Sequence, residues 1–422
     1  MCLTVPVKIK KLEGTRALID GEDGELSLEL AAAPDVRAGD WVLHVNGLVI
    51  KKIPTKDAKQ ILDLLEGVNK NIKSLEPSSK LSHAIEAVKS GTPEITDIEY
   101  LLNREGAEKE ALFLEAGSAR REHIKDFICI HGIIEFSNHC EMDCTYCGLR
   151  SDNTKLERYR MEPDEIIECA VDAIEKKGYK LIILQSGEDS YYTDDKLVNI
   201  IEEIKKRCRC FLFLSSGERG YESYKRLKRA GASGVLLRFE TSNETLFKKI
   251  HPRGKDFSSR FEHLKFLREL GFFIATGSLI GLPGQTSLDI ARDILAIKKF
   301  ANMATIGPFI ATPGTPLEGE VYGETELTLK AVSIIRLLMK KVRLPVVTAF
   351  ETLSGEDGRR RALNSGANSL MLNLTPEAYR TLYSIYPDKF FDSGSIWERY
   401  GLFNYTESYA MLEETMAKEI GG

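Results

Sequence analysis

The chain has 422 residues, with 58 basic and 63 acidic side chains, a net charge of −5 and an apolar fraction of 43%. This length allows two or three domains or one large barrel with appendages, and so mild a charge argues against nucleic acid or a membrane as a partner. The sequence contains neither 18 consecutive uncharged apolar residues nor a secretory signal. We therefore expect a cytoplasmic protein rather than a secreted, disordered or membrane one.

Residues 1–68 have the pattern of a small, OB-like β-barrel domain. Alternating apolar residues, separated by glycine turns, predict four or five short strands. These lie within Val5–Ile9, Arg16–Ile19, Leu26–Leu30 and Trp41–Ile50. A helix is expected at Lys56–Leu65. Residues 69–124 follow as a linker and a helical lead-in, with helical patterning from Leu81 to Ile124.

From residue 125 to residue 390, apolar strands alternate with amphipathic helices. Eight buried strands with helices between them, over about 245 residues, are typical of an α/β fold of the (β/α)8 barrel type. An open, doubly wound sheet is the alternative, but no Gly-x-Gly-x-x-Gly opens a helix after the first strand, which disfavours a dinucleotide site. The expected strands are Phe127–Phe136, Leu181–Gln185, Phe211–Ser215, Gly234–Phe239, Phe273–Leu279, Ala304–Ile310, Pro345–Phe350 and Ser369–Asn373. Residues 391–422 are expected to form a C-terminal helical extension.

Three of the eight cysteines, Cys140, Cys144 and Cys147, form the most informative run of the sequence. Eight cysteines are too few for a disulfide framework, and in a reducing compartment thiols stay available to metals. These spacings let one loop wrap three thiolates around a single metal centre. Structural zinc takes four protein ligands, whereas a four-iron cluster accepts three and leaves one iron open. Zinc with a distant fourth ligand and three incidental cysteines are the alternatives.

This spacing, with Tyr146 just before the last cysteine, resembles the signature of the radical S-adenosylmethionine (SAM) superfamily. The resemblance implies a 4Fe–4S cluster whose open iron binds the amino and carboxylate groups of SAM. It also implies that one electron from the cluster cleaves SAM to methionine and a 5′-deoxyadenosyl radical. An electron donor such as ferredoxin or flavodoxin would then be a partner.

Polar residues occur at the expected C-terminal ends of several strands, where barrel enzymes hold their catalytic groups. The turn Gln185–Glu188 follows strand two, and its small residues allow close approach to the amino-acid part of SAM. An ordinary β–α turn is the alternative. Arg238 and Glu240 point the same way from strand four. If both point into the barrel, their burial is costly unless a ligand or the opposite charge of the pair satisfies them. We expect Glu240 to bind a cationic or hydroxyl part of SAM and Arg238 an anion, with a structural ion pair as the alternative. Thr348 closes strand seven.

Other candidate residues carry weaker signals. Tyr379, Tyr383 and Tyr386 recur at helical spacing, for which packing is the alternative to a catalytic role. The seven histidines form no His-x-x-x-His or His-Glu-x-x-His pattern, so hydrolytic metal chemistry has no support.

Residues 81–390 resemble the FeFe-hydrogenase maturase HydE family, in the radical SAM group that includes biotin synthase and the pyrrolysine-pathway mutase. The matching runs include His131–Asn138, Leu184–Asp189, Gly281–Thr286 and Ile306–Ile310. The resemblance implies that Cys140, Cys144 and Cys147 bind the cluster and that Tyr146 lies over SAM. The positions that match the SAM shell are Gln185, Ser186, Gly187, Glu188, Glu240, Arg260, Met303 and Ile306. Those that match the lining of the substrate chamber are Arg238, Thr348, Tyr383 and Tyr386.

The chain departs from the family pattern in the expected chamber. Val347 precedes Thr348 where the family has two threonines, and Glu351 stands where a glycine is usual. Leu372 replaces a proline, and Phe239 a common histidine. A lost hydroxyl and an added carboxylate should change which anionic or polar substrate is held. The departures put the HydE substrate in doubt, but not the SAM chemistry.

Residues 1–68 resemble a second family, the HypC/HupF assembly chaperones of nickel–iron hydrogenases. The match includes Met1–Leu3, Gly39–Leu43 and Asn46–Ile50. In that family the cysteine after the initiator Met and a strand histidine hold an iron–carbonyl–cyanide unit. Cys2 is present, but the histidine position is Val45, with His44 one place earlier, and one residue along a strand reverses the facing. Carriage of the iron unit by Cys2 is one interpretation, and a docking or purely structural domain is the other.

Both resemblances predict an enzyme of organometallic iron cofactor assembly. Its partners would be a small-molecule or organometallic substrate, an electron donor and other maturation proteins. One rival is a radical SAM mutase or lyase that acts on an amino acid or another small organic molecule. The other is a metal-carrying scaffold without turnover, against which the intact runs Cys140–Cys147 and Ser186–Glu188 argue.

Overall fold

The structure is a computed structural model that describes residues 6–21, 24–30, 33, 35–45, 48–60, 62, 78–124, 128–253 and 256–391. The chain divides into two compact units, residues 1–78 and residues 79–422. Residues 79–124, expected as part of a linker and lead-in, therefore include three helices that belong to the second unit.

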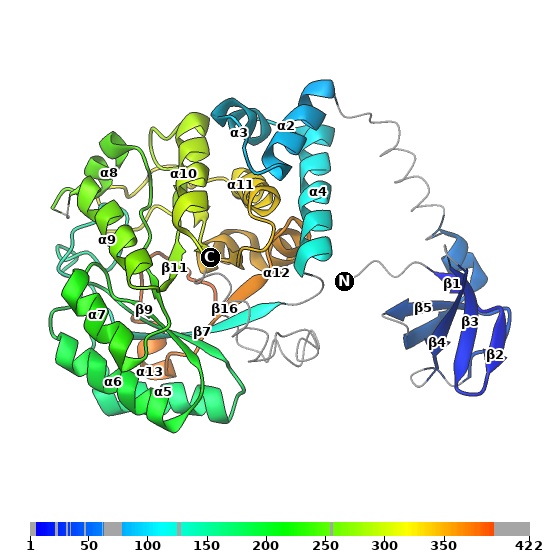
Figure 1. Cartoon of the computed structure of the whole chain (residues 1–422), viewed down its shortest axis with the longest axis horizontal. Helices are drawn as coiled ribbons and strands as arrows, with labels where there is room; N and C mark the ends of the chain where they lie inside the picture. The colour runs from blue at the N-terminus through cyan, green and yellow to red at the C-terminus, as the bar shows by residue number, and fades with distance from the viewer. Residues whose placement is uncertain are drawn as a thin grey trace. The chain divides into compact units, whose positions relative to one another are not determined.

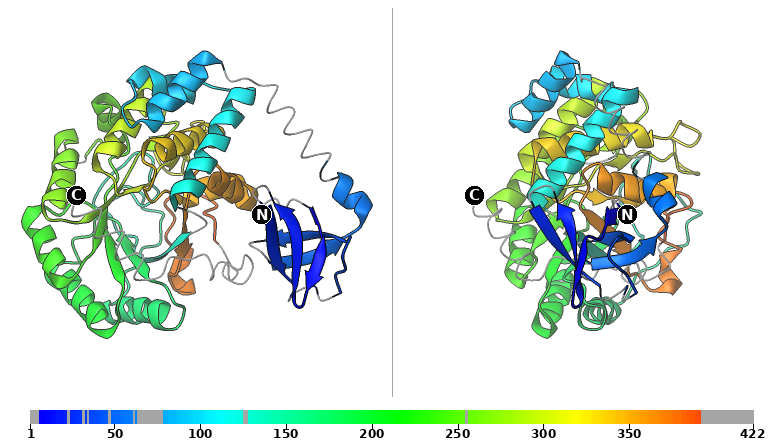
Figure 2. Two further views of the ribbon diagram at one scale, coloured as in Figure 1. Left: turned by 45° about the vertical axis from the view of Figure 1, so that its right-hand side comes forward. Right: turned by 90° about the vertical axis from the view of Figure 1, so that its right-hand side faces the viewer.

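The first unit is a six-stranded, mainly antiparallel sheet in the order β1-β5-β6-β4-β3-β2. Its strands are β1 Val7–Lys8, β2 Lys11–Glu13, β3 Arg16–Gly21, β4 Gly24–Glu29, β5 Trp41–Val45 and β6 Leu48–Ile53. Apolar side chains that alternate along these strands, among them Ile19, Leu28 and Val42, build a separate core. The antiparallel strands are visible from two sides in Figure 2. Residues 55–60 are helical, and most of the rest of the helix expected at Lys56–Leu65 lies outside the described residues.

The second unit contains an eight-stranded parallel sheet in the order β13-β11-β10-β9-β8-β7-β16-β15. Its strands are β7 Cys129–Ser137, β8 Leu181–Ser186, β9 Phe211–Ser215, β10 Gly234–Leu236, β11 Phe273–Thr276, β13 Met303–Ala304, β15 Pro345–Val346 and β16 Ser369–Asn373. The two edges meet in a parallel bridge between Met303 and Arg343, where the Ala304 amide donates to the Arg343 carbonyl at 2.8 Å. The strands close into a barrel, which confirms the expected (β/α)8 fold.

Helices surround the barrel strands (Figure 1). They are α2 Ser79–Lys89, α3 Ile95–Leu102, α4 Gly106–Ile124, α5 Pro163–Glu175, α6 Asp194–Arg207, α7 Tyr221–Ala230, α8 Glu244–Ile250, α9 Phe257–Glu269, α10 Ser287–Phe300, α11 Thr325–Leu338, α12 Thr348–Asn364 and α13 Glu377–Arg380. α5 shows how the sequence forms them: Pro163 opens its first turn, and Glu162 and Glu165 form a capping box. Helix α11 packs on α4, and α10 on α3. No helix in the described part of the chain is long and apolar enough to cross a membrane.

Alternate residues of the barrel strands face two different cores. On β7, Ile130, Ile134 and Phe136 pack outward against the helices, whereas Cys129 and Ile133 face the barrel interior. This period of two is the reason why continuously apolar strands predicted a sheet buried on both faces.

Several strands are shorter than the sequence predicted. Strands five and six each continue after a break, as β12 Leu279–Ile280 and β14 Gly307–Pro308, which pair with each other. The break lies where Gly277 packs so closely that a Cβ there would lie 1.8 Å from the Thr305 carbonyl oxygen. The expectation of a strand through Phe350 is wrong, because α12 begins at Thr348.

Candidate active site

The three cysteines Cys140, Cys144 and Cys147 lie in the loop that follows β7, at the C-terminal end of the barrel. All three are free and partly accessible. The loop is fixed to the barrel from two sides: the Thr145 amide donates to the Ile250 carbonyl, and the Gly148 amide to the Ile385 carbonyl, both at 2.9 Å. A Cβ at Gly148 would lie 2.2 Å from the Ser384 carbonyl oxygen. The loop therefore has a fixed course that presents its thiols together.

Burial raises the pKa of all three thiols, to about 12 for Cys147, and neighbouring cysteines raise the pKa of Cys144 and Cys147 further. Thiols with such raised pKa values need a cation to become thiolates. In the described part of the chain, no group of three His, Cys, Asp or Glu side chains converges on a single metal ion. An iron–sulfur cluster needs no such convergence because each cysteine binds a different iron. The donor set fits a cluster better than zinc.

The turn Ser186-Gly187-Glu188 after β8 lies directly against the cysteine loop. The Glu141 amide donates to the Glu188 carbonyl at 2.9 Å, and a Cβ at Gly187 would lie 2.7 Å from that of Cys140. Gln185 at the end of β8 hydrogen-bonds Tyr383. The turn expected to bind the amino-acid part of SAM is therefore next to the first cysteine.

Tyr146 connects the cysteine loop with the residues expected around SAM. Its hydroxyl lies 3.3 Å from His251 Nε2. Burial raises the pKa of Tyr146 well above its ordinary value, and the charges of Glu240, Cys144 and Cys147 add to the increase. The ring therefore lies between the loop and the end of strand four.

Glu240 and Arg238 lie after β10 in an unusual backbone arrangement. Glu240 has a φ of 64°, in the left-handed region that non-glycine residues rarely adopt. Its Oε2 lies 3.1 Å from Arg238 Nη2, and Arg238 also donates to the Ser278 carbonyl at 2.7 Å. Burial raises the pKa of Glu240, against the charges of Arg238 and Arg260. Arg238 and Glu240 thus form a pair on the same side of the chain, as expected. The strained backbone of Glu240 is typical of a functional position.

Arg260 of α9 lies beside these residues, held by a carboxylate that the sequence analysis overlooked. Arg260 Nε donates to Glu218 Oε1 at 2.5 Å, and its Nη1 donates to the Arg238 carbonyl. The Glu218 side chain is fully buried. Glu218 follows β9 in the run Ser215–Glu218. A polar residue just after a strand was the signal that pointed to Glu188, and the same signal could have identified Glu218.

Met303 and Ile306 are buried, but in different layers. Met303 belongs to the barrel interior with Phe273 and Ala275, and Ile306 packs in the layer between barrel and helices. No described contact joins either residue to the cysteine loop. Their role in a SAM shell stays a prediction.

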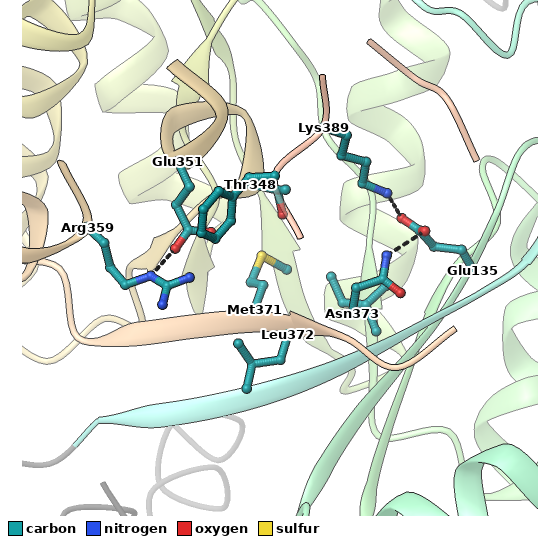
Figure 3. A pocket seen from close by; sticks show the side chains of 10 residues that line it. Glu135, Thr348, Glu351, Arg359, Met371, Leu372, Asn373 and Lys389 are labelled. Atoms are coloured by element: carbon teal, nitrogen blue, oxygen red, sulfur yellow. Dashed lines mark hydrogen bonds and ion pairs between the residues drawn. The ribbon is translucent and has the colours of Figure 1, made fainter. Parts of the chain in front are cut away.

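A small pocket opens at the C-terminal ends of β7, β15 and β16 (Figure 3). It is lined by Ile133, Glu135, Thr348, Glu351, Arg359, Met371, Leu372, Asn373, Lys389 and Phe390. Lys389 pairs with Glu135, which also accepts a hydrogen bond from Asn373 at 2.8 Å. Arg359 pairs with Glu351, the carboxylate that replaces the family glycine. Thr348 lines this pocket, and its place in a substrate chamber stays a prediction. The carboxylate of Glu351 is compensated by Arg359.

Tyr383 and Tyr386 reach the same region. The charge of Glu135 adds to the effect of burial, which raises the pKa of both tyrosines, and that of Glu351 acts on Tyr386. Lys389 Nζ lies 4.9 Å from the centre of the Tyr383 ring. The structure thus places both tyrosines near Glu135, although neither is among the residues that line the pocket. No sequence signal pointed to Lys389, which follows the last barrel strand.

In the first unit, Cys2 lies outside the described residues. His44 is on β5, next to a shift in the β5–β6 register between Leu43 and His44. Its Nδ1 is buried and has no hydrogen-bond partner among the described residues. Whether His44 acts together with Cys2 stays a prediction.

Comparison with known proteins agrees with this geometry. Residues 134–297 match the model of the radical SAM superfamily, and residues 1–65 match that of the HupF/HypC family. The [FeFe] hydrogenase maturase subunit HydE of Thermotoga maritima is 46% identical over 281 residues, which cover 66% of this chain and 80% of that protein. This chain belongs to the HydE family of radical SAM enzymes. Its first unit is a HypC-like domain.

More distant relatives support the same fold. The 3-methylornithine synthase of Methanosarcina acetivorans is 29% identical over 279 residues, covering 64% of this chain and 77% of that protein. The crystal structure of methylornithine synthase (PylB) matches with a TM-score of 0.69 at 24% identity, over 79% of this chain and 99% of that one. Membership of the radical SAM superfamily implies a 4Fe–4S cluster and SAM, which the cysteine loop and the adjoining turn fit.

Proposed function

We propose that this HydE-family enzyme cleaves SAM reductively and acts on a small organometallic iron compound during hydrogenase assembly. The observation that carries the proposal is the hydrogen-bonded junction of the Cys140–Cys147 loop with the Ser186–Glu188 turn, beside a pocket of buried charges. The relative named as an [FeFe] hydrogenase maturase subunit supports the choice of process.

The residues divide into three groups in this proposal. Cys140, Cys144 and Cys147 would hold the cluster, which supplies the electron that cleaves SAM. The SAM shell would consist of Tyr146, Gln185, Ser186, Gly187, Glu188, Glu240, Arg260, Met303 and Ile306. The chamber residues Arg238, Thr348, Tyr383 and Tyr386 would orient the substrate, and the buried Tyr383 would help to keep water from the reacting atoms.

The HypC-like unit would handle an iron unit that the barrel modifies. The match to the HupF/HypC family over residues 1–65 supports this part of the proposal. Cys2 would be the thiolate that carries an iron–carbonyl–cyanide unit, and other maturation proteins would deliver or receive it. An electron donor such as ferredoxin or flavodoxin would reduce the cluster.

A second candidate function is a mutase or lyase reaction on an amino acid. The similarity to 3-methylornithine synthase supports it. The pocket combines two carboxylates with two cations, Glu135 with Lys389 and Glu351 with Arg359, and such a surface also suits a zwitterion. The choice between the two functions depends on the substrate.

The test of SAM cleavage uses full-length protein reconstituted anaerobically with iron and sulfide. Incubation with SAM and dithionite should release 5′-deoxyadenosine and methionine. Cys144→Ala should abolish this release and lower the iron content. Cys169→Ala is the matched control, because Cys169 is a half-buried thiol on α5 that lies outside the loop, and it should leave both unchanged. Protein that binds only zinc, or holds a full cluster without cleaving SAM, would contradict the proposal.

The test of the substrate compares two additions to the same assay. A cysteine-ligated iron–carbonyl–cyanide complex should increase the rate of 5′-deoxyadenosine release several-fold, whereas lysine or ornithine should not. The opposite result would favour the amino-acid reaction. Cys2→Ser should lower iron retention by full-length protein incubated with the complex, without changing the iron and sulfide of the cluster.

A further inference from the structure

Arg158 makes an unusual set of contacts with the cysteine loop. Its Nη1 donates to the carbonyl oxygens of Asn138 at 2.5 Å and Leu149 at 2.9 Å. Its Nη2 donates to those of Arg150 at 2.8 Å and Asn153 at 3.2 Å. One of these residues precedes Cys140 and three follow Cys147. A single guanidinium therefore joins both ends of the loop that carries the three thiols.

The backbone around Arg158 is itself fixed to the same place. The Asn138 side chain donates to the Glu157 carbonyl and accepts from the Tyr159 amide, both at 2.7 Å. Arg158 thus lies between two residues that are hydrogen-bonded to the start of the loop. Because its five N–H groups have a rigid planar geometry, arginine can bridge several fixed carbonyls in a way that lysine cannot.

Arg158 forms no ion pair with a carboxylate among the described residues. Its four acceptors are uncharged carbonyls, and it is within electrostatic range of Cys140 and Cys147. Arg160, two positions along the chain, differs: its guanidinium makes a two-pronged ion pair with Asp189 at 2.8 and 2.9 Å.

We propose that Arg158 is a positioning residue that holds the cluster loop closed through its four hydrogen bonds and places an uncompensated positive charge beside the cluster. This inference rests on the proposed function, in which the loop binds a 4Fe–4S cluster. A cluster that accepts one electron gains one negative charge, and a cation nearby in a partly buried site stabilises that form. The charge favours the reduced state, and the hydrogen bonds favour retention of the irons.

Two substitutions separate the charge from the hydrogen bonds. Arg158→Gln removes the charge, and Arg158→Lys keeps it but loses the planar set of donors. Arg380→Gln is the matched control, because the Arg380 guanidinium also binds a backbone carbonyl, that of Thr375, at 3.0 and 3.1 Å, but outside the cluster loop. Each full-length protein is reconstituted with iron and sulfide, and its iron content, rate of iron release to a chelator and midpoint potential are measured.

The midpoint potential of Arg158→Gln should become more negative. We expect about tenfold less reduced cluster at a set applied potential, which is about 59 mV for a one-electron couple. Arg158→Lys should keep a potential close to that of the unsubstituted protein but release iron several-fold faster. Arg380→Gln should change neither quantity.

Unchanged potential in Arg158→Gln at full iron content would overturn the role of the charge, and unchanged iron release in Arg158→Lys would overturn the role of the hydrogen bonds. Arg158→Gln protein that holds no cluster supports the positioning role if Arg380→Gln protein holds a full cluster. If neither variant holds a cluster, the result contradicts that role. Failure of the proposed function looks different, because the unsubstituted protein would then hold no cluster or leave SAM intact.

Discussion

Buried charged side chains around the barrel mouth are arranged in pairs. Asp143 pairs with Arg150 inside the cysteine loop, and Glu218 pairs with Arg260 beside it. A buried charge without a partner is costly, and removal of one member of such a pair is strongly destabilising. Arg158 lacks a carboxylate partner among the described residues and is within electrostatic range of Cys140 and Cys147. Arg158 differs from these paired side chains, and its charge is therefore available to the proposed cluster.

His131 on β7 should make the stability of the barrel depend on pH. It is fully buried and neither ring nitrogen has a hydrogen-bond partner among the described residues. Burial, with the charge of Arg343, lowers its pKa from 6.5 to about 3. Below pH 6.5, His131 binds a proton in the unfolded chain but not in the folded chain. The contribution of the neutral His131 to the unfolding free energy is therefore complete above pH 6.5 and is lost as the pH falls towards 3. The loss is about 2 kcal/mol at pH 5.

The substitution His131→Leu tests this expectation. The apoprotein is unfolded with urea at pH 8 and pH 5, and unfolding is followed by circular dichroism. The difference in unfolding free energy between the two pH values should shrink by about 2 kcal/mol in the variant. An equal difference in both proteins would show that another group sets the pH dependence.

At the scale of elements, the ends of the barrel strands and the turns that follow them determine where the site residues lie. The turn after β8 contacts the loop after β7. Tyr146 of that loop is within electrostatic range of Glu240, which follows β10, and Arg260 donates to the carbonyl of Arg238 in the same segment. The chain after β16 returns over the same end of the barrel, where Lys389 enters the pocket (Figure 3). Four segments far apart in sequence therefore meet at one rim, as expected for parallel strands of a barrel.

Gly187 should be required for the contact between the turn and the cysteine loop. A Cβ at this position would lie 2.2 Å from the His139 carbonyl oxygen and 2.7 Å from the Cβ of Cys140. Gly187→Ala should therefore push the two segments apart and weaken SAM binding at least tenfold in the reconstituted protein, as measured by equilibrium dialysis. Gly178→Ala is the control, since Gly178 has a positive φ but open space around it. Equal effects of both substitutions would point to general destabilisation.

The ion pair between Lys389 and Glu135 should hold the C-terminal segment onto the barrel. The two side chains are 7% and 2% exposed, so loss of the lysine leaves a buried carboxylate without its cation. Lys389→Met should lower the unfolding free energy by about 3 kcal/mol. The double variant with Glu135→Gln should recover most of this loss. If the double variant is no more stable than Lys389→Met in urea unfolding, the charge on Glu135 is not the cause.

At the scale of the whole molecule, the sequence predicted the features that repeat or cluster locally. Alternating apolar strands predicted the barrel, and the spacing of Cys140, Cys144 and Cys147 predicted the loop. It could not predict that Glu351 has Arg359 as a partner or that Lys389 reaches Glu135, since these pairs form only when distant segments meet. Strand ends were overestimated where apolar residues continue into a helix, as at Phe350.

The two units should unfold separately, and the barrel should cleave SAM without the first unit. The β unit has its own core around Ile19, Leu28 and Val42, and the barrel has separate inner and outer cores. The cysteine loop and the residues proposed to bind SAM all lie within residues 79–422, so the barrel contains every group proposed for SAM cleavage. The fragment 79–422 should therefore cleave SAM within about twofold of the full-length rate once reconstituted, and calorimetry of the full-length protein should show two transitions. A single cooperative transition together with an inactive fragment would mean that the HypC-like unit completes the catalytic machinery.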